Sequence, residues 1–497
     1  MKKKYVRWTL WTIASPFILF IILCILIYLP PIQNFLVDKA AVYASEATGM
    51  NISVGRISLS FPLNLVVTNV DAASPHNDTL LSVRRLQVNV QLLPLLKKQV
   101  EVDGISLQGA TVNSNDLIHG MKLNGTLGEL FISSHGVALD PETAIVNKVL
   151  LKDTDLSLCL NDTAAADTAA SDTTYWKIIL QDIDLQNVSF ALDMPLDSLS
   201  LAASLDNAIL RDGLIDLHKS AYSLQTFRIK NGRVRYDSGR PSATASADSL
   251  SAGLDPSHIA LTDIGVKLDS LYYEGRNMKA VISQFVLKER SGVEIVSTEG
   301  RLVSNDKVLR VPSLKLETRD SYLELNAAMD WNALDFKDEG LVSARLMADI
   351  GKPDVVRFMG SMDEKFIRQY PSEPLRIRTG IDGDLNKLKL TTLTAELPGA
   401  LGLFARGELT HLTDSLLRGG DITLEAETKD LKFVSTLAEG IEIPYGTRLE
   451  GKFTMAGTKM GTDLLLMQPE AQAVVAADTI PITVYNDLSL IHISEPT

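Results

Sequence analysis

The sequence predicts a mainly β protein, with an N-terminal transmembrane helix followed by a repetitive antiparallel β-structure and a few short helices. A long uncharged apolar run lies near the N-terminus, most of the remaining chain alternates apolar and polar residues, and one strand-like motif recurs five times. Alternation with a period of two is typical of strands that have one apolar and one polar face. Because 497 residues exceed what one compact core usually holds, we expect several domains or a repeat array.

The N-terminal apolar run has the features of a membrane anchor. No charged residue occurs from Trp8 to Val37, and the most apolar part, Trp11–Leu29, would span about 28 Å as a helix. Basic residues before it place the N-terminus in the cytoplasm and the body of the chain on the other side of the membrane. A cleavable signal peptide is the alternative, but this run is long for one. The predicted anchor residues are Trp11, Phe17, Leu23 and Leu29.

Composition and charge argue against several classes of function. Four of the 48 basic residues precede the anchor, so the rest of the chain carries 44 basic against 61 acidic residues, a poor match for a nucleic-acid backbone. Two cysteines and seven scattered histidines show no metal-ligand spacing, and no phosphate-binding loop or nucleophile elbow is present. The pairs Asp153/Asp155 and Asp182/Asp184 are interpreted as solvated strand residues. We therefore expect no enzymatic activity, no cofactor and no metal.

The chain divides into segments of different pattern. Residues 1–31 are predicted to form the basic tail and transmembrane helix, 32–48 a short amphipathic helix, 49–160 a first β-repeat region, 161–174 a low-complexity mobile loop, and 175–487 a further β-repeat region. Within the last region, 354–370 and 429–439 are predicted to contain short helices. Residues 488–497 look like a translated adapter sequence, so we expect the native protein to continue beyond about residue 487.

A degenerate motif recurs through the first half of the chain. It reads apolar-x-apolar-x-(Gly/Asn/Asp)-x-x-apolar, and its five copies begin 34 to 44 residues apart. They start at Leu65, Ile105, Val149, Ile183 and Phe227, and place Asn69, Gly109, Asp153, Asn187 and Asn231 at the turn-forming position. Five copies in order predict stacked strand units that are too small to fold alone, although a β-rich chain can produce such matches by chance.

Strands with one apolar face must cover that face. A second sheet, helices, curling of the sheet on itself, or lipid could each do so. The sequence has too few helical patterns for helices to cover so much sheet. An ordinary two-sheet structure and a curled sheet with an apolar concave face remain open on physical grounds.

The order of parts resembles the AsmA/TamB family of envelope proteins. After the anchor and amphipathic helix comes Ala47-Thr-Gly-Met-Asn-Ile-Ser-Val-Gly-Arg-Ile-Ser-Leu-Ser-Phe-Pro-Leu-Asn-Leu-Val-Val-Thr-Asn-Val70, which is similar to the opening of that family. Gly380-Ile-Asp-Gly-Asp-Leu-Asn-Lys-Leu-Lys-Leu and Gly407-Glu-Leu-Thr-His-Leu are similar to its repeated strand units. TamB-like chains are longer and end in a conserved domain that has no counterpart here.

The resemblance implies an elongated, twisted β-sheet curled into a groove, reaching from the inner membrane of a Gram-negative-type cell into the periplasm. Its expected ligands are phospholipid acyl chains, and an outer-membrane barrel of the Omp85 type is a possible partner through a missing C-terminal part. No catalytic residue is implied. The groove-lining residues would be Val88, Val90, Ile105, Leu107, Ile183, Leu185, Leu323 and Leu325.

Three functions are therefore compared. A lipid conduit between the inner and outer membranes predicts a continuous apolar face that protein does not cover. A translocation or assembly factor for outer-membrane β-barrels or autotransporters predicts a covered face and an unpaired strand edge. A surface stalk or adhesin predicts exposed aromatic patches, yet aromatic residues make up only 6% of the chain. We rank these three in that order, and an enzyme fourth, because the sequence offers no site for one.

Overall fold

The computed structural model describes most of the chain after the N-terminal segment. The described residues are 39, 41–43, 45–46, 48–60, 64–74, 79–90, 102–114, 120–138, 142–161, 175–239, 253–336, 340–359, 364–436, 445–468, 471–475 and 479–481. Trp11, Phe17, Leu23 and Leu29 lie outside them, as do the low-complexity segment 162–174 and the tail 488–497. Among the described residues, no helix has the length and apolarity needed to cross a bilayer.

The protein consists of two compact units, which are described separately. Unit 1 comprises Met1–Thr244 and Ser257–Val266, and unit 2 comprises Ala245–Pro256 and Lys267–Thr497. The boundary falls within strand β11 (His258–Glu274).

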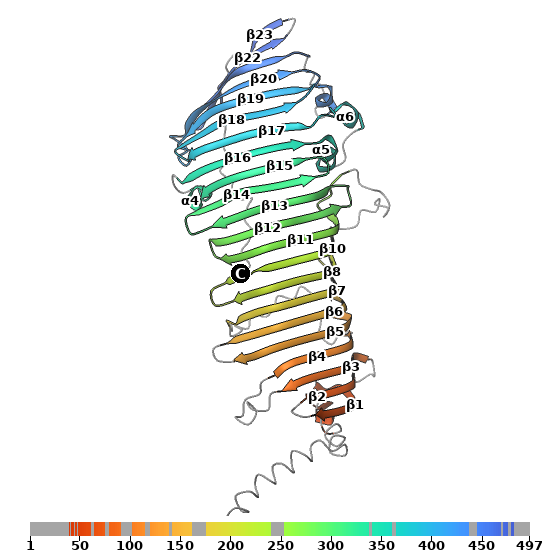
Figure 1. Cartoon of the computed structure of the whole chain (residues 1–497). Coiled ribbons are helices and arrows are strands. Elements are labelled where there is room, and N and C mark those ends of the chain that lie inside the picture. Colours follow the sequence, from red (N-terminus) through yellow and green to blue (C-terminus); the bar gives the residue numbers. More distant parts are fainter. Residues whose placement is uncertain are drawn as a thin grey trace, which may run out of the picture. The chain divides into compact units, whose positions relative to one another are not determined.

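Unit 1 is built from strands that pair with their neighbours in the chain (Figure 1). All the pairs between β1 and β6 are antiparallel, β6 and β7 are parallel, and β8 pairs antiparallel with β7, β9 and β10. The strands are β1 (Asn51–Ser60), β2 (Asn64–Ala73), β3 (Thr79–Val90), β4 (Val102–Asn113), β5 (Met121–Ala138), β6 (Thr143–Leu160), β7 (Lys177–Met194), β8 (Leu199–Asp216), β9 (Ala221–Leu224) and β10 (Thr226–Ser238).

Unit 2 is an antiparallel meander in which each strand from β12 to β22 pairs with the next one along the chain. Its strands are β12 (Asn277–Glu289), β13 (Glu294–Ser304), β14 (Val308–Thr318), β15 (Tyr322–Asp330), β16 (Leu341–Ile350), β17 (Leu375–Asp384), β18 (Lys387–Leu397), β19 (Leu401–Thr410), β20 (Gly419–Thr428), β21 (Arg448–Ala456), β22 (Lys459–Gln468), β23 (Ala471–Val475) and β24 (Thr479–Pro481). The prediction of a mainly β, predominantly antiparallel chain is thus confirmed.

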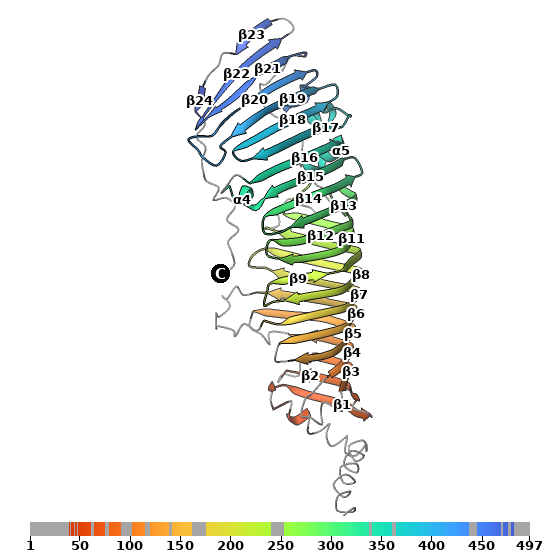
Figure 2. The same ribbon diagram turned by 60° about the vertical axis from the view of Figure 1, so that its left-hand side comes forward.

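Among the described residues that follow β1, helices are few and lie in the connections of unit 2 (Figure 2). They are α4 (Trp331–Leu334), α5 (Lys352–Phe358), α6 (Glu364–Gln369) and the 3-10 helix η1 (Lys432–Thr436). Helices α5 and α6 fall where 354–370 was predicted to be helical, and η1 falls within the predicted 429–439. Near the start of the described chain, residues 39, 41–43, 45, 46 and 48 are helical, so the described part of the helix predicted over 32–48 is helical, and 32–38 lie outside the described residues.

The central residues of the recurring sequence motif form one row across unit 1 in which the backbone is left-handed. The central residue of each of the five copies has a positive φ: 53° at Asn69, 62° at Gly109, 50° at Asp153, 52° at Asn187 and 53° at Asn231. These are mid-strand positions, where side chains other than glycine rarely adopt this conformation. The five lie in one row because the strand pairing continues in unbroken register on both sides of them.

Each residue with positive φ moves the side-chain alternation by one position. A Cβ atom built on Gly232 would lie 3.2 Å from Cγ2 of Ile229, so these two residues face the same side although they are three apart. In an uninterrupted strand they would face opposite sides. Asp212 has a φ of 51°, and the Cβ position of the following Gly213 likewise meets Leu210. The change of alternation explains why the motif has two residues, rather than one, between its turn-forming residue and the next apolar one.

Asn187 provides a test of this backbone requirement. Replacing Asn187 with valine should lower the free energy of unfolding by about 1–3 kcal/mol relative to Asn187→Gly, because a β-branched residue is strained at positive φ and glycine is not. Both variants lose the hydrogen bond from Asn187 Nδ2 to Asp153 Oδ1 (2.9 Å), so their difference isolates the backbone term. Chemical denaturation measures both, and equal stabilities would contradict the assignment.

Candidate functional site

The predicted groove-lining residues of unit 1 lie in two adjacent apolar rows. Leu107 and Leu185 belong to one row, and Val88, Ile105 and Ile183 to the next. In strand order the first row is Ile57, Val67, Leu86, Leu107, Leu130, Leu151, Leu185, Ala208 and Ile229. The second is Leu59, Leu65, Val88, Ile105, Ile132, Val149, Ile183, Leu210 and Phe227. Every member of these two nine-strand rows is apolar. Val90 lies opposite Val102 at the end of its strand.

The opposite face of unit 1 is mixed. The row on the far side of the first apolar row is polar and consists of Arg56, Thr68, Arg85, Gln108, Glu129, Lys152, Gln186, Asn207 and Lys230. The row between the two apolar rows contains polar and apolar residues: Ser58, Val66, Gln87, Ser106, Phe131, Leu150, Asp184, Ile209 and Arg228. Since neighbouring residues in a strand point to opposite faces, unit 1 has one apolar face and one face of mixed polarity over the same nine strands.

Unit 2 has the same division into faces. Leu323 belongs to the row Leu316, Leu323, Ala348, Ile377, Ala395, Leu403, Ala426, Leu449. Leu325 belongs to the row Leu314, Leu325, Leu346, Thr379, Leu393, Ala405, Leu424, Gly451. Two further rows continue this apolar face, one through Ala344, Ile381, Leu390 and Phe453, and one through Met329, Val342, Leu388 and Met455.

Large and small side chains alternate on the apolar face of unit 2. From β16 to β21, a strand that contributes a large residue to the Leu323 row contributes a small one to the Leu325 row, and the next strand does the reverse. The pairs are Ala348 with Leu346, Ile377 with Thr379, Ala395 with Leu393, Leu403 with Ala405, Ala426 with Leu424, and Leu449 with Gly451. The face is therefore dimpled rather than flat.

The large residues of these rows are half-buried, neither enclosed nor fully exposed. This holds for all eight predicted groove-lining residues, in both units. It also holds for Leu346, Leu393, Leu403, Leu424 and Leu449. A second sheet packed face to face would enclose such side chains as a core. In the described part of unit 1, Phe190 of the apolar face is 38% exposed.

Apart from the small side chains of Ala405 and Ala348 within the rows, which are 2% and 3% exposed, the deeply buried apolar residues of unit 2 lie at the strand ends. At one end the connections pack into a helical-side cluster made of Phe366, Tyr370, Leu397, Ala400, Leu431 and Phe433. Phe433 makes edge-on contacts with Phe366 and Tyr370, at ring-centroid distances of 5.8 and 5.2 Å. Phe366 is only 1% exposed and Ala400 is fully buried. The cluster packs on Leu375 and Leu401, the terminal residues of the apolar face.

A smaller loop-side cluster occupies the opposite strand ends. It consists of Ala333 in α4, Val342 in β16 and Leu385 in the β17–β18 turn, with Leu412 of the β19–β20 connection packed against it. Met329, Ile381 and Leu388 of the apolar face also contact this cluster. Both clusters therefore lie on the apolar side of the sheet, one at each end of its strands.

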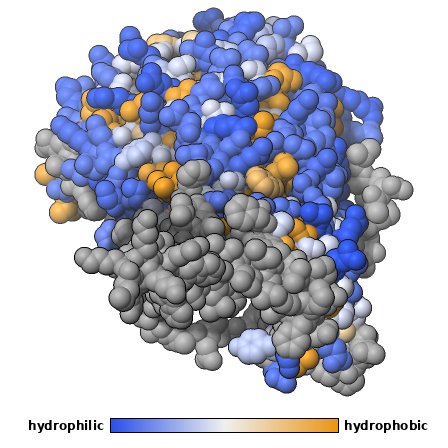
Figure 3. Space-filling model, turned by 60° about the horizontal axis from the view of Figure 1, so that its bottom comes forward, coloured by the Kyte–Doolittle hydropathy of each residue, from blue (hydrophilic) through white to orange (hydrophobic). Residues whose placement is uncertain are grey.

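The face opposite is charged and carries cross-strand ion pairs. Arg378 pairs with Asp349 at 2.8 Å, and Lys387 pairs with Glu408 at 3.0 Å. A hollow of 440 Å³ over β18–β21 is lined mainly by residues of this face, including Phe404, Glu425 and Glu450. Figure 3 shows the molecule with its lower end forward, and hydrophilic residues with scattered apolar patches make up the coloured surface in that view.

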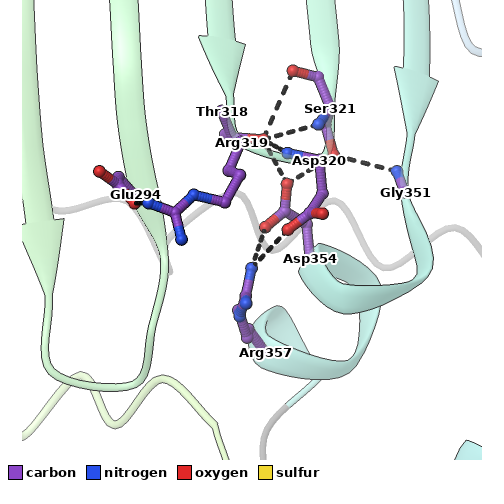
Figure 4. Close-up of polar contacts among 8 residues, drawn as sticks. All are labelled: Glu294, Thr318, Arg319, Asp320, Ser321, Gly351, Asp354 and Arg357. Carbon is purple, nitrogen blue, oxygen red and sulfur yellow. Dashed lines mark hydrogen bonds and ion pairs between the residues drawn. The ribbon is translucent and has the colours of Figure 1, made fainter.

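Asp354 holds α5 against the turn between β14 and β15, a role that the sequence did not reveal (Figure 4). The side chain is 1% exposed, and it accepts hydrogen bonds from the hydroxyls of Thr318 and Ser321. Arg357 Nη1 lies 3.1 Å from Asp354 Oδ1 and 2.8 Å from Asp320 Oδ2. In the sequence, the only indication of this role was the position of Asp354 in the first turn of a predicted short helix, where an acidic side chain is favourable.

Acidic residues from the two pairs singled out in the sequence form hydrogen bonds or an ion pair within the sheet. Asp153 accepts a hydrogen bond from Asn187, and Asp184 accepts hydrogen bonds from Gln186 and Asn207. Asp182 pairs with Arg211. Within the described ranges, no group of three or more His, Cys, Asp or Glu side chains is placed to hold a metal ion.

No protein-family model matches this chain, and neither a curated protein nor a solved structure matches it.

The contacts of Asp354 predict a large loss of stability on its removal. In Asp354→Ala two hydroxyls and a guanidinium lose a buried acceptor, so the free energy of unfolding of unit 2 should fall by about 3–5 kcal/mol. Glu364→Ala is the control, because Glu364 is 80% exposed and pairs with the exposed Arg368. Its effect should stay within about 0.5 kcal/mol. Similar values for both variants in chemical denaturation would refute the structural role of Asp354.

The burial of Tyr370 predicts that the free energy of unfolding of unit 2 falls at alkaline pH. Burial in the helical-side cluster raises the pKa of its phenol above the ordinary value of 10.0. The stabilisation linked to this shift is therefore complete below about pH 10 and is lost as the pH rises through the pKa of the folded state. Tyr370→Phe should remove this part of the pH dependence. Unfolding measured at neutral and alkaline pH would disprove the effect if both proteins lost stability equally.

Proposed function

We propose that this chain is an inner-membrane-anchored periplasmic protein that conducts phospholipid between the inner and outer membranes and so contributes to outer-membrane biogenesis. The observation that carries the proposal is the distribution of burial in unit 2. The strand ends are closed by the helical-side and loop-side clusters, whereas the large side chains in the middle of the apolar face between them are only half-buried. An ordinary sandwich buries the middle of its faces most.

The half-buried face is large. Four rows across eight strands correspond to an area on the order of 1,000 Å², given the spacings of residues along and between strands. Contiguous apolar patches on monomeric proteins rarely exceed a few hundred Å² unless they bind something. Burying acyl methylenes here would be favourable by about 0.8 kcal/mol for each CH₂ group.

The surface is suited to an extended apolar chain. The two apolar rows of unit 1 cross nine strands without a polar residue, a length of about 38 Å at 4.8 Å per strand. None of the apolar rows named for either unit contains a charged side chain. A phospholipid could keep its acyl chains on this face and its headgroup in water at the open side.

Two further features support this assignment over the assembly-factor function. The predicted anchor precedes the strands of unit 1 in the sequence, so the β-structure would begin next to the membrane from which lipid is taken. The assembly-factor function requires a covered apolar face, and the half-buried leucines of unit 2 argue against one. An Omp85-type barrel contacting a further part of the protein belongs to the same proposal.

In-cell photocrosslinking tests the conduit. Probes at Leu107, Leu185 and Leu325 should form lipid adducts, which mass spectrometry would detect. Probes at Gln108, Gln186 and Asn326 are the matched controls, because each is the next residue in the strand and faces the other way.

Lipid adducts at the three apolar positions and not at the controls would support the conduit. Protein adducts, or no adducts at either set, would mean that protein covers the apolar face. The conduit would then be rejected and the assembly-factor function preferred.

A further inference from the structure

The β19–β20 connection presents two leucines to solvent at the loop-side ends of the strands. Leu416 is 80% exposed and Leu417 is 64% exposed, which places them among the most exposed large apolar residues described. Leu412 of the same connection packs into the loop-side cluster. The exposed leucines are thus joined to a segment that reaches the apolar face.

The tip of this connection is held in place. Asp414 Oδ1 accepts hydrogen bonds from the N–H groups of Leu416 (2.8 Å) and Leu417 (3.2 Å). These bonds keep the pKa of the Asp414 carboxyl below its usual range. The N–H of Arg418 donates to the carbonyl of Asp414 at 2.8 Å, and the N–H of Gly457 donates to the carbonyl of Arg418 at 2.7 Å. The exposure of the two leucines is therefore a property of an ordered turn.

A second exposed apolar side chain lies at the same strand ends. Phe336 follows α4 in the β15–β16 connection, is 60% exposed and has a φ of 52°. A bulky residue in this backbone region is strained, and such strain is often found where a side chain has a function. In an antiparallel meander, every second connection lies on the same side of the sheet. The β15–β16 and β19–β20 connections therefore both lie at the loop-side ends of the strands, and this row of strand ends is called the loop-side edge.

We propose that this edge of unit 2, with Leu416, Leu417 and Phe336 as its apolar contacts, docks on the surface of a lipid bilayer. The inference rests on the conduit proposed above and assigns the place where lipid enters or leaves it. The loop-side cluster, through Leu412 and Leu388, joins this edge to the apolar face, so a bilayer docked here would lie next to the start of that face.

The shape of the edge, and a lysine beside it that lacks an acidic partner in the described part of the chain, favour a bilayer over a protein partner. Two adjacent leucines on a turn form a protrusion, which a fluid apolar phase can surround, whereas a protein would need a matching pocket. Lys459 closes the β21–β22 turn that packs against this tip, is exposed, and has no acidic partner among the described residues. Its ammonium group would meet the phosphates of the lipid headgroups.

Fluorescence quenching tests the docking on the full chain held in nanodiscs. A single cysteine at Leu416→Cys, in a Cys24→Ser/Cys159→Ser background, would carry an environment-sensitive fluorophore. Vesicles of phosphatidylcholine and phosphatidylglycerol with spin-labelled acyl chains are then added. Leu196→Cys is the matched control, because Leu196 is also an exposed leucine (63%) in a tight turn. Quenching at 416 and not at 196 is expected.

A variant separates this proposal from the conduit. Leu416→Ser/Leu417→Ser should weaken vesicle docking by roughly ten-fold for each leucine and slow lipid transfer to vesicles, with adducts at Leu325 unchanged. Absence of quenching at 416, or equal quenching at 196, would overturn the docking site. Transfer at the wild-type rate by the double variant would also overturn it and leave the conduit intact. Absence of transfer and of Leu325 adducts in the unaltered chain would instead reject the conduit.

Discussion

Cross-strand register is the constraint on which the other features of this structure depend. Side chains alternate along a strand, so a slip of one residue would move a whole apolar set to the other face. In unit 1, Leu107 must stand opposite Leu86 and Leu130 for the apolar row to continue. The five residues with positive φ in unit 1 lie at the same level in their strands. At each of them the alternation of side chains shifts by one residue, so the apolar residues on both sides of that level point to the same face.

In unit 2 the residues that stabilise the fold by burial lie mainly at the strand ends, away from the middle of the apolar face. Phe366, Tyr370 and Phe433 supply compact burial at one end of the strands, and Ala333 and Leu385 supply it at the other. Asp354 fixes α5 beside the first of these clusters through hydrogen bonds that span more than thirty residues of sequence. The middle of the sheet can then stay half-exposed, since the fold does not rely on enclosing it.

The two faces make different contributions to the proposed conduit. Charged pairs such as Arg378–Asp349 keep one face compatible with water, while the rows through Leu323 and Leu325 keep the other free of charge. Alternating large and small residues give the apolar face dimples, and the dimples increase its contact area with a flexible chain. The exposed leucines at the loop-side edge place an apolar contact next to this face.

The sequence by itself determined the strands, their apolar and polar sides, and the positions of most short helices, because these follow from local periodicity. It also located Asn69, Gly109, Asp153, Asn187 and Asn231 as special positions, although not their left-handed backbone. Only the tertiary structure decided which rows meet, that β6 and β7 are parallel, and that Phe366 packs on Phe433. Those features arise from contacts between residues far apart in the chain, where register and packing compete among many arrangements of equal local periodicity.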